Sequence, residues 1–164
     1  MDALHCIYSR RETREYLDRE VPEDVVWRIV EAGRLAGSAK NRQPWDFILI
    51  RSRERLRELA RYGQSTRHLP SAAFAIVIVR RDEYFQDPFD AGRAAQNMML
   101  AAHALGVGSC PITLHDQVGA KRYLGVPEDR VIQVCIAFGY PAPRKRRGKV
   151  LRRPAEEILH LERW

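Results

Sequence analysis

Three arginines near the amino terminus could bind an anion. Arg10, Arg11 and Arg14 fall within one short segment, and a guanidinium forms paired hydrogen bonds with phosphate oxygens. If the segment is helical, Arg10 and Arg14 share a face at spacing i, i+4, where two like charges repel mildly unless an anion lies between them. A basic helix end that faces solvent accounts for the same residues. These residues alone leave both interpretations open.

A second polar stretch supplies neutral hydrogen-bonding groups. Ser38, Asn41 and Gln43 precede Pro44 and Trp45 and follow no helical or strand period. Side-chain amides donate and accept hydrogen bonds, which suits the edge of a heterocycle such as a flavin. A turn in which Ser38 and Asn41 satisfy their own backbone is the alternative. Together, the two stretches provide the charge and the amides that a phosphorylated heterocyclic cofactor needs.

A glycine-containing passage over residues 106–112 would let backbone N–H groups approach a ligand, although glycines that end a helix explain it almost as well. Cys110 lies in this passage, in a predicted turn, and is a candidate nucleophile, but the sequence assigns it no histidine partner. Apolar neighbours favour buried, reduced thiols for Cys6 and Cys135. An odd number of widely spaced cysteines argues against a disulfide framework.

Other catalytic and metal sites lack their sequence signatures. The histidines are scattered, and no HExxH pair indicates a metal site. No Gly-x-Ser-x-Gly elbow supports a serine nucleophile. No GxGxxG or GxxxxGK[ST] motif is present either. The sequence therefore predicts no metal and no residue dedicated to acid–base or nucleophilic catalysis.

The chain of 164 residues is large enough for a buried core, and we expect one domain over residues 1–164. Its longest apolar run, residues 72–79, is too short to span a bilayer, and the polar amino terminus lacks the apolar core of a signal peptide. A cytoplasmic protein without a membrane partner is expected.

The net charge of +7 comes in large part from residues 144–153. Nucleic-acid binding is one explanation of this charge, and a solvated, arginine-rich surface is another. The second is favoured, because no recognition helix, zinc finger or aromatic RNA-binding strand accompanies the charge. Nucleic acid is therefore not expected as a partner.

The elements that must position these groups alternate irregularly along the chain. Helical spacing and capping residues predict the helices, and apolar runs predict the strands. The strand over residues 72–79 is apolar throughout, so we expect it to be covered on both faces. The predicted helices are residues 3–8, Pro22 to about Gly33, 54–61, 90–105 and 116–123, and the predicted strands are residues 47–50, 72–79 and 131–138. Because no regular βαβ repeat appears, we expect an α+β sandwich, a sheet with helices on its faces.

An ordered series of short motifs resembles the FMN-dependent nitroreductase family. Any one motif is weak, but the series runs in order through nearly the whole chain. Its main members are Arg10-Arg11-x-x-Arg14, Ser38-x-x-Asn41-x-Gln43-Pro44-Trp45, Gln96-Asn97-Met98-Met99, Leu105-Gly106-Val107-Gly108-Ser109 and Phe138-Gly139-Tyr140-Pro141. The resemblance implies a central, mostly antiparallel sheet flanked by helices and a domain-swapped homodimer. Two FMN sites would lie at the interface, each lined by both subunits.

The resemblance also implies which residues hold FMN. Arg10 and Arg11 would bind its phosphate, joined by Arg152, and Arg14 would lie near the pyrimidine edge, where positive charge stabilises the reduced flavin. The amide-rich stretch would come from the partner subunit, and Ile112 would present backbone groups toward flavin N5 and O4. The full implied set is Arg10, Arg11, Arg14, Ser38, Asn41, Gln43, Ile112, Thr113 and Arg152.

The implied chemistry belongs largely to the cofactor. NADH or NADPH would pass hydride to flavin N5, and a nitroaromatic, quinone or similar electrophile would then take its place in a ping-pong cycle. A flavin-sequestering protein with little turnover, reductive dehalogenation and flavin fragmentation are the alternatives. Glu12 stands where the family usually has Ser, which puts a carboxylate near the phosphate, and it is expected to turn outward or to pair with Arg14.

Overall fold

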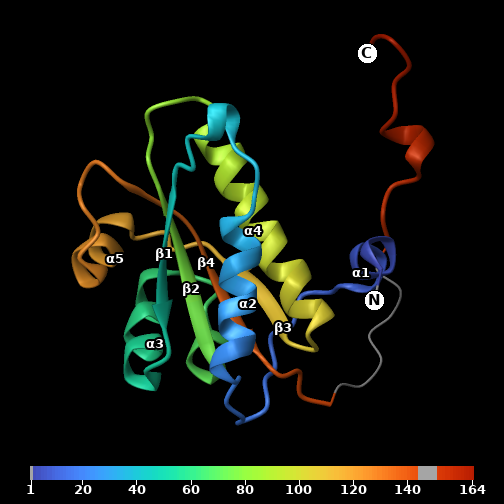
Figure 1. Cartoon of the computed structure of the whole chain (residues 1–164). Coiled ribbons are helices and arrows are strands. Elements are labelled where there is room, and N and C mark those ends of the chain that lie inside the picture. The colour runs from blue at the N-terminus through green and yellow to red at the C-terminus, as the bar shows by residue number, and fades with distance from the viewer. Residues whose placement is uncertain (1, 144–150) are drawn as a thin grey trace.

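The computed structural model describes residues 2–143 and 151–164, and within them four strands form one sheet (Figure 1). The strands are β1 (Trp45–Ile50), β2 (Phe74–Arg80), β3 (Gly108–Ile112) and β4 (Val131–Gly139). Their order is β1-β2-β4-β3, so β1 and β3 form the two edges. All three neighbouring pairs are antiparallel, which confirms the expected antiparallel sheet of an α+β fold.

Helices cover both faces of this sheet, as the sequence predicts. The α-helices are α1 (Ala3–Ser9), α2 (Glu23–Arg34), α3 (Arg53–Leu59), α4 (Asp87–Ala104) and α5 (Gln117–Leu124), and short 3-10 turns are η1 (Ala39–Asn41), η2 (Ala60–Tyr62), η3 (Leu69–Ser71) and η4 (Ala155–Glu157). Asp116 caps α5 by accepting a hydrogen bond from the Gly119 N–H. The predicted helices are confirmed, with ends that shift by a few residues.

The central strand β2 divides the core in two because its side chains alternate between the faces. Ile76 and Ile78 pack with α2 and α4, whereas Val77 and Val79 pack with α3 and α5 on the opposite face. Every residue of β2 is buried, as predicted for a strand covered on both sides. The sheet is therefore a rigid support to which both helix layers are attached.

Helix α4 lies deep against the sheet and against α2 (Figure 1). Its inward side carries small or flexible residues, and Ala94, Met98 and Ala102 are fully buried. A Cβ atom at Gly33 of α2 would lie only 2.2 Å from Met98 Cε, so a glycine lets the two helices approach. This contact fixes the position of α4 relative to the rest of the core.

Residues 10–16, called here segment 10–16, are extended rather than helical. Helix α1 ends at Ser9, after which the Thr13 N–H donates to the Ser109 carbonyl at 2.9 Å. Tyr16 forms an isolated bridge with Pro141. The conditional prediction that Arg10 and Arg14 share a helical face is therefore wrong, because bonds to distant strands pull the segment out of the helix.

The turn predicted at Cys110 is also wrong, because residues 108–112 form the edge strand β3 and pair with β4. Beyond β4, residues 151–164 extend away from the sheet (Figure 1). This tail exposes several large apolar side chains, which are Leu151, Ile158, Leu159, Leu161 and Trp164. Among the residues that the structure describes, no helix has the length and apolar character needed to cross a bilayer.

Candidate functional site

A polar cleft lies between segment 10–16 and the connection that precedes β2. It has a volume of about 570 Å³, within the range of small-molecule sites. Its lining residues are Arg14, Glu15, Gln64, Ser65, Arg67, His68 and Ser71. Two guanidinium groups and several neutral donors thus face one space, a composition that suits an anionic, hydrogen-bonding ligand.

His68 is a buried imidazole in this cleft. Only 7% of the residue is exposed, and its Nε2 makes no hydrogen bond to any residue that the structure describes. Burial, and then the charge of Arg14, lower its pKa, so the ring is neutral at pH 7 and offers one donor and one acceptor. Sequence reasoning missed this residue because it set all the histidines aside as scattered. The polar run Gln64-Ser65 just before it was the available signal.

Arg10 precedes Arg14 in segment 10–16, is partly buried and keeps unused donor capacity. Its Nη2 donates to Glu12 Oε1 at 2.6 Å, while its buried Nη1 has no hydrogen-bond partner among residues 2–143 and 151–164. Glu12 thus pairs with Arg10 and not, as expected from the sequence, with Arg14. A buried guanidinium N–H without an acceptor is costly, so this position favours an anionic ligand.

Arg11 and Arg14 differ from Arg10 in their surroundings. Arg11 is exposed, and its Nη1 donates to the backbone carbonyls of Tyr8 and Arg10 at 2.7 Å each. Arg14 is exposed and lines the cleft. Arg152, in the tail, is exposed and donates to the Leu151 carbonyl. Its proposed role at a phosphate stays a prediction, and residues 144–150, where part of the basic run falls, lie outside the described residues.

Strand β3 borders the same region. Ile112 is buried and pairs with Cys135 of β4, whereas Thr113 is exposed and its carbonyl oxygen lies against Gly63, 2.7 Å from where a Cβ would be. Cys110 is fully buried, and burial raises its pKa to about 11, so at neutral pH it is a thiol. The thiolate is the reactive form, so the structure speaks against Cys110 as a nucleophile.

The amide-rich stretch forms a strained, exposed loop, called here loop 38–43. The Gln43 N–H donates to Ser38 Oγ, and the Ala39 N–H donates to Asp90 Oδ2, both at 2.9 Å. Three residues of the loop lie in the left-handed region of backbone φ, which residues other than glycine rarely adopt. They are Lys40 (φ 51°), Asn41 (55°) and Gln43 (48°). Such strain is typical of functional loops.

The two polar regions lie at opposite ends of α4. Loop 38–43 is tied to Asp90 near the start of the helix, whereas Ser9, next to Arg10, lies 2.8 Å from His103 Nε2 near its end. These helix positions are separated by about 20 Å along the axis, at 1.5 Å per residue. The structure therefore places Arg14 at the cleft, keeps Arg10 on the same extended segment, and leaves Ser38, Asn41 and Gln43 apart from both.

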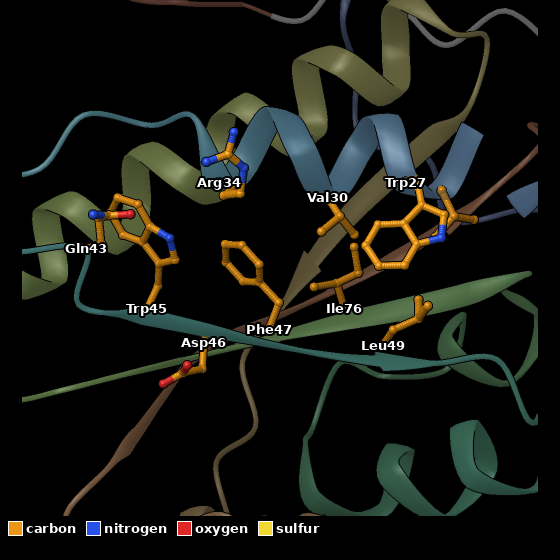
Figure 2. Close-up of a pocket in the computed structure, with 10 residues that line it drawn as sticks. Trp27, Val30, Arg34, Gln43, Trp45, Asp46, Phe47, Leu49 and Ile76 are labelled. Carbon is orange, nitrogen blue, oxygen red and sulfur yellow. The ribbon is translucent and has the colours of Figure 1, made fainter. Parts of the chain in front are cut away.

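An apolar groove runs beside loop 38–43, between α2 and the edge strand β1 (Figure 2). Figure 2 shows Trp27 and Val30 of α2 facing Phe47 and Leu49 of β1, with Gln43 at one end. The groove has a volume of about 460 Å³, and Trp27 is 62% exposed. Exposed apolar surface of this kind marks an interaction site.

The chain is similar to known proteins in sequence and in fold. A family model described as the nitroreductase family matches residues 7–73 and 65–140. A relative from Archaeoglobus fulgidus, provisionally named an NADH dehydrogenase/NAD(P)H nitroreductase, is 32% identical over 172 residues, which cover 99% of each chain.

Solved structures agree with the sequence matches. An FMN-dependent nitroreductase from Clostridium difficile superposes with a TM-score of 0.87 and 27% identity over 98% of this chain and 99% of that one. A nitroreductase with bound FMN from Bacteroides fragilis gives a TM-score of 0.81 and 26% identity over 94% of this chain and 97% of that one.

Proposed function

This chain belongs to the nitroreductase family, and on that basis we propose that it is an FMN-dependent NAD(P)H oxidoreductase that works as a homodimer. The observation that carries the proposal is a set of available donors: the Arg14 guanidinium and the neutral ring of His68 at the cleft, and the buried Nη1 of Arg10 on the same segment as Arg14. Charged and neutral donors side by side are what a phosphorylated flavin requires.

The residues fit FMN in the following way. Arg10, Arg11 and Arg152 would hold the phosphate, and Arg14 would face the pyrimidine edge, where its charge stabilises negative charge that develops during reduction. Ile112 and Thr113 would offer backbone groups to the central ring. The buried, neutral thiol of Cys110 would take no part in the chemistry.

The chemistry that bound FMN supplies is hydride acceptance at N5 from NADH or NADPH and the later reduction of a nitroaromatic, quinone or similar electrophile in a ping-pong cycle. The chain's own residues would bind and orient the partners. This division of labour is consistent with the guanidinium groups and neutral donors that line the cleft. We expect mutations of the binding residues to act mainly through cofactor affinity.

The positions of the two polar regions support the proposed homodimer. Because they lie at opposite ends of α4, Ser38, Asn41 and Gln43 of one copy would complete the cleft of a second copy. The exposed apolar side chains of the tail and the groove beside β1 support this assembly, since apolar surface of that extent is covered in most stable proteins. Two equivalent flavin sites would result.

Spectroscopy of the purified protein tests the proposal. We expect a yellow protein, or a colourless one that quenches flavin fluorescence on titration with FMN, and we expect NADH or NADPH to bleach the colour without oxygen. A protein that takes up no FMN would contradict the proposal. A yellow protein that neither nucleotide bleaches would instead indicate flavin storage without turnover.

A further inference from the structure

The Glu12 carboxylate forms an ion pair with Arg10, one of the residues that the proposed function assigns to the FMN phosphate. Its Oε1 lies 2.6 Å from Arg10 Nη2, and 14% and 32% of the Arg10 and Glu12 side chains are exposed. An ion pair so shielded from water interacts more strongly than a surface pair, because the effective dielectric constant is lower. Arg10 therefore already has an anionic partner before any ligand arrives.

The main chain at Glu12 is held against β3. Glu12 forms a bridge with Ser109 of β3, and the neighbouring Thr13 N–H donates to the Ser109 carbonyl at 2.9 Å. The negative charge of Glu12 also contributes to the raised pKa of the Cys110 thiol, after the larger effect of burial. The main-chain contacts thus keep the Glu12 carboxylate within reach of Arg10.

A phosphate bound at Arg10 would meet this carboxylate at close range. Nη1 of Arg10 can donate to the phosphate while Nη2 stays on Glu12, but the two anions then share one guanidinium and repel each other. Alternatively, the phosphate displaces Glu12, whose carboxylate then gives up its contact with Arg10. Both routes weaken binding of a phosphorylated flavin, and neither affects a flavin that lacks the phosphate.

We infer that Glu12 competes with the ligand phosphate for Arg10 and thereby determines how strongly the site prefers FMN over riboflavin. This inference rests on the proposed flavin-binding function and adds to it a residue that sets cofactor specificity. A serine or glutamine at position 12 would give a site that discriminates more strongly for the phosphate. With Glu12 present, contacts to the flavin ring contribute a larger share of the affinity for FMN than contacts to its phosphate.

The test is the ratio of dissociation constants for riboflavin and FMN, measured by flavin fluorescence on the full chain. We expect Glu12→Gln to raise FMN affinity about tenfold or more, because it removes a like charge beside the phosphate, and to change riboflavin affinity little. Glu12→Ser, which also removes the carboxylate, should act in the same direction. Thermal unfolding curves establish that each variant is folded.

A matched control separates the local effect from net charge. Glu31 pairs with Arg34 at the same 2.6 Å distance on exposed α2, so Glu31→Gln makes the same charge change outside the cleft. The Glu31→Gln variant should leave the ratio of the riboflavin and FMN dissociation constants unchanged.

The outcomes distinguish this inference from the proposed function. If the chain binds flavins and Glu12→Gln leaves the ratio unchanged, the inference is overturned and the function stands. A drop in FMN affinity would show that Glu12 orients Arg10 for the phosphate, which also overturns it. If neither wild type nor any variant binds FMN or riboflavin, the proposed function itself fails, and the inference fails with it.

Discussion

Segment 10–16 and loop 38–43 occupy opposite ends of α4, and different kinds of bond hold them. The segment is tied by main-chain hydrogen bonds to β3 and to the end of β4, and the Tyr16 hydroxyl donates to the Thr13 carbonyl at 2.6 Å. The loop is tied mainly by side chains, through Ser38 and Asp90, and carries three residues with left-handed backbone.

This difference matches the groups that each region presents. Segment 10–16 carries the charged guanidinium groups, and none of its residues has a positive φ. The exposed amides of loop 38–43 are neutral, and the strain in their backbone is tolerated because Asp90, which is 2% exposed, anchors the loop to a rigid helix. Segment 10–16 thus presents charged groups on an unstrained backbone, whereas loop 38–43 presents neutral amides on a strained one.

The largest effect is expected from mixing copies that are damaged in different regions. An Arg10→Ala chain and an Asn41→Gly chain should each bind FMN poorly as homodimers. A purified heterodimer of the two should recover one intact site, since the two lesions fall in the same site. Titration with FMN counts the sites.

The control for this experiment combines Arg10→Ala with Arg14→Ala. Both changes lie in segment 10–16, so each site of their heterodimer keeps one lesion and no intact site forms. Recovery in the control, or none in the test pair, would mean that the two regions do not meet across subunits.

Arg10→Ala alone should weaken FMN binding about 10- to 100-fold, the loss typical of a charge-assisted hydrogen bond. Riboflavin binding should fall much less, because riboflavin has no phosphate. Paired fluorescence titrations measure both constants. An equal loss for the two flavins would mean that Arg10 supports the ring and not the phosphate.

Asp90→Ala should damage the loop and not the segment. It leaves the Ala39 N–H without its acceptor, which should lower the free energy of unfolding by about 1–3 kcal/mol. FMN and riboflavin affinities should fall together, unlike the result for Arg10. Chemical denaturation and flavin titration measure the two effects, and Asp90→Asn, which keeps an oxygen acceptor, should retain most of both.

The smallest effect is expected at Lys40, which is exposed and has a φ of 51°. Lys40→Gly removes the left-handed strain, so the free energy of unfolding should rise by up to about 1 kcal/mol. Ala39→Gly, next to it but without positive φ, should lower stability. Denaturation curves of the two variants measure these opposite changes in stability. A destabilised Lys40→Gly variant would show that the loop is not strained.

The sequence predicted well what depends on local pattern. The apolar run of β2, the periodic face of α2 and the Asp116 cap of α5 are each signalled by adjacent residues. Residue type singled out Arg10 and Arg14, and the family resemblance implied their role at a flavin. The structure places Arg14 at the polar cleft and leaves Arg10 Nη1 buried without a partner among the described residues.

Features that depend on distant partners were missed. Segment 10–16 is extended because it bonds to residues about a hundred positions away, which no local pattern reveals. Pro111 lacks an N–H and so weakens the strand signal of β3, yet an edge strand tolerates it. His68 gave no motif, because what makes it a candidate is the burial of its ring in the cleft near the charge of Arg14.

The separation of the two polar regions along α4 has a consequence for how the cofactor is retained. A complete site in the proposed dimer exists only while two copies are associated, so FMN and the second copy stabilise each other's binding by mass action. Flavin occupancy would then depend on protein concentration as well as on flavin concentration. A dilute sample would lose its colour before it lost its fold, and added FMN would drive the copies back together.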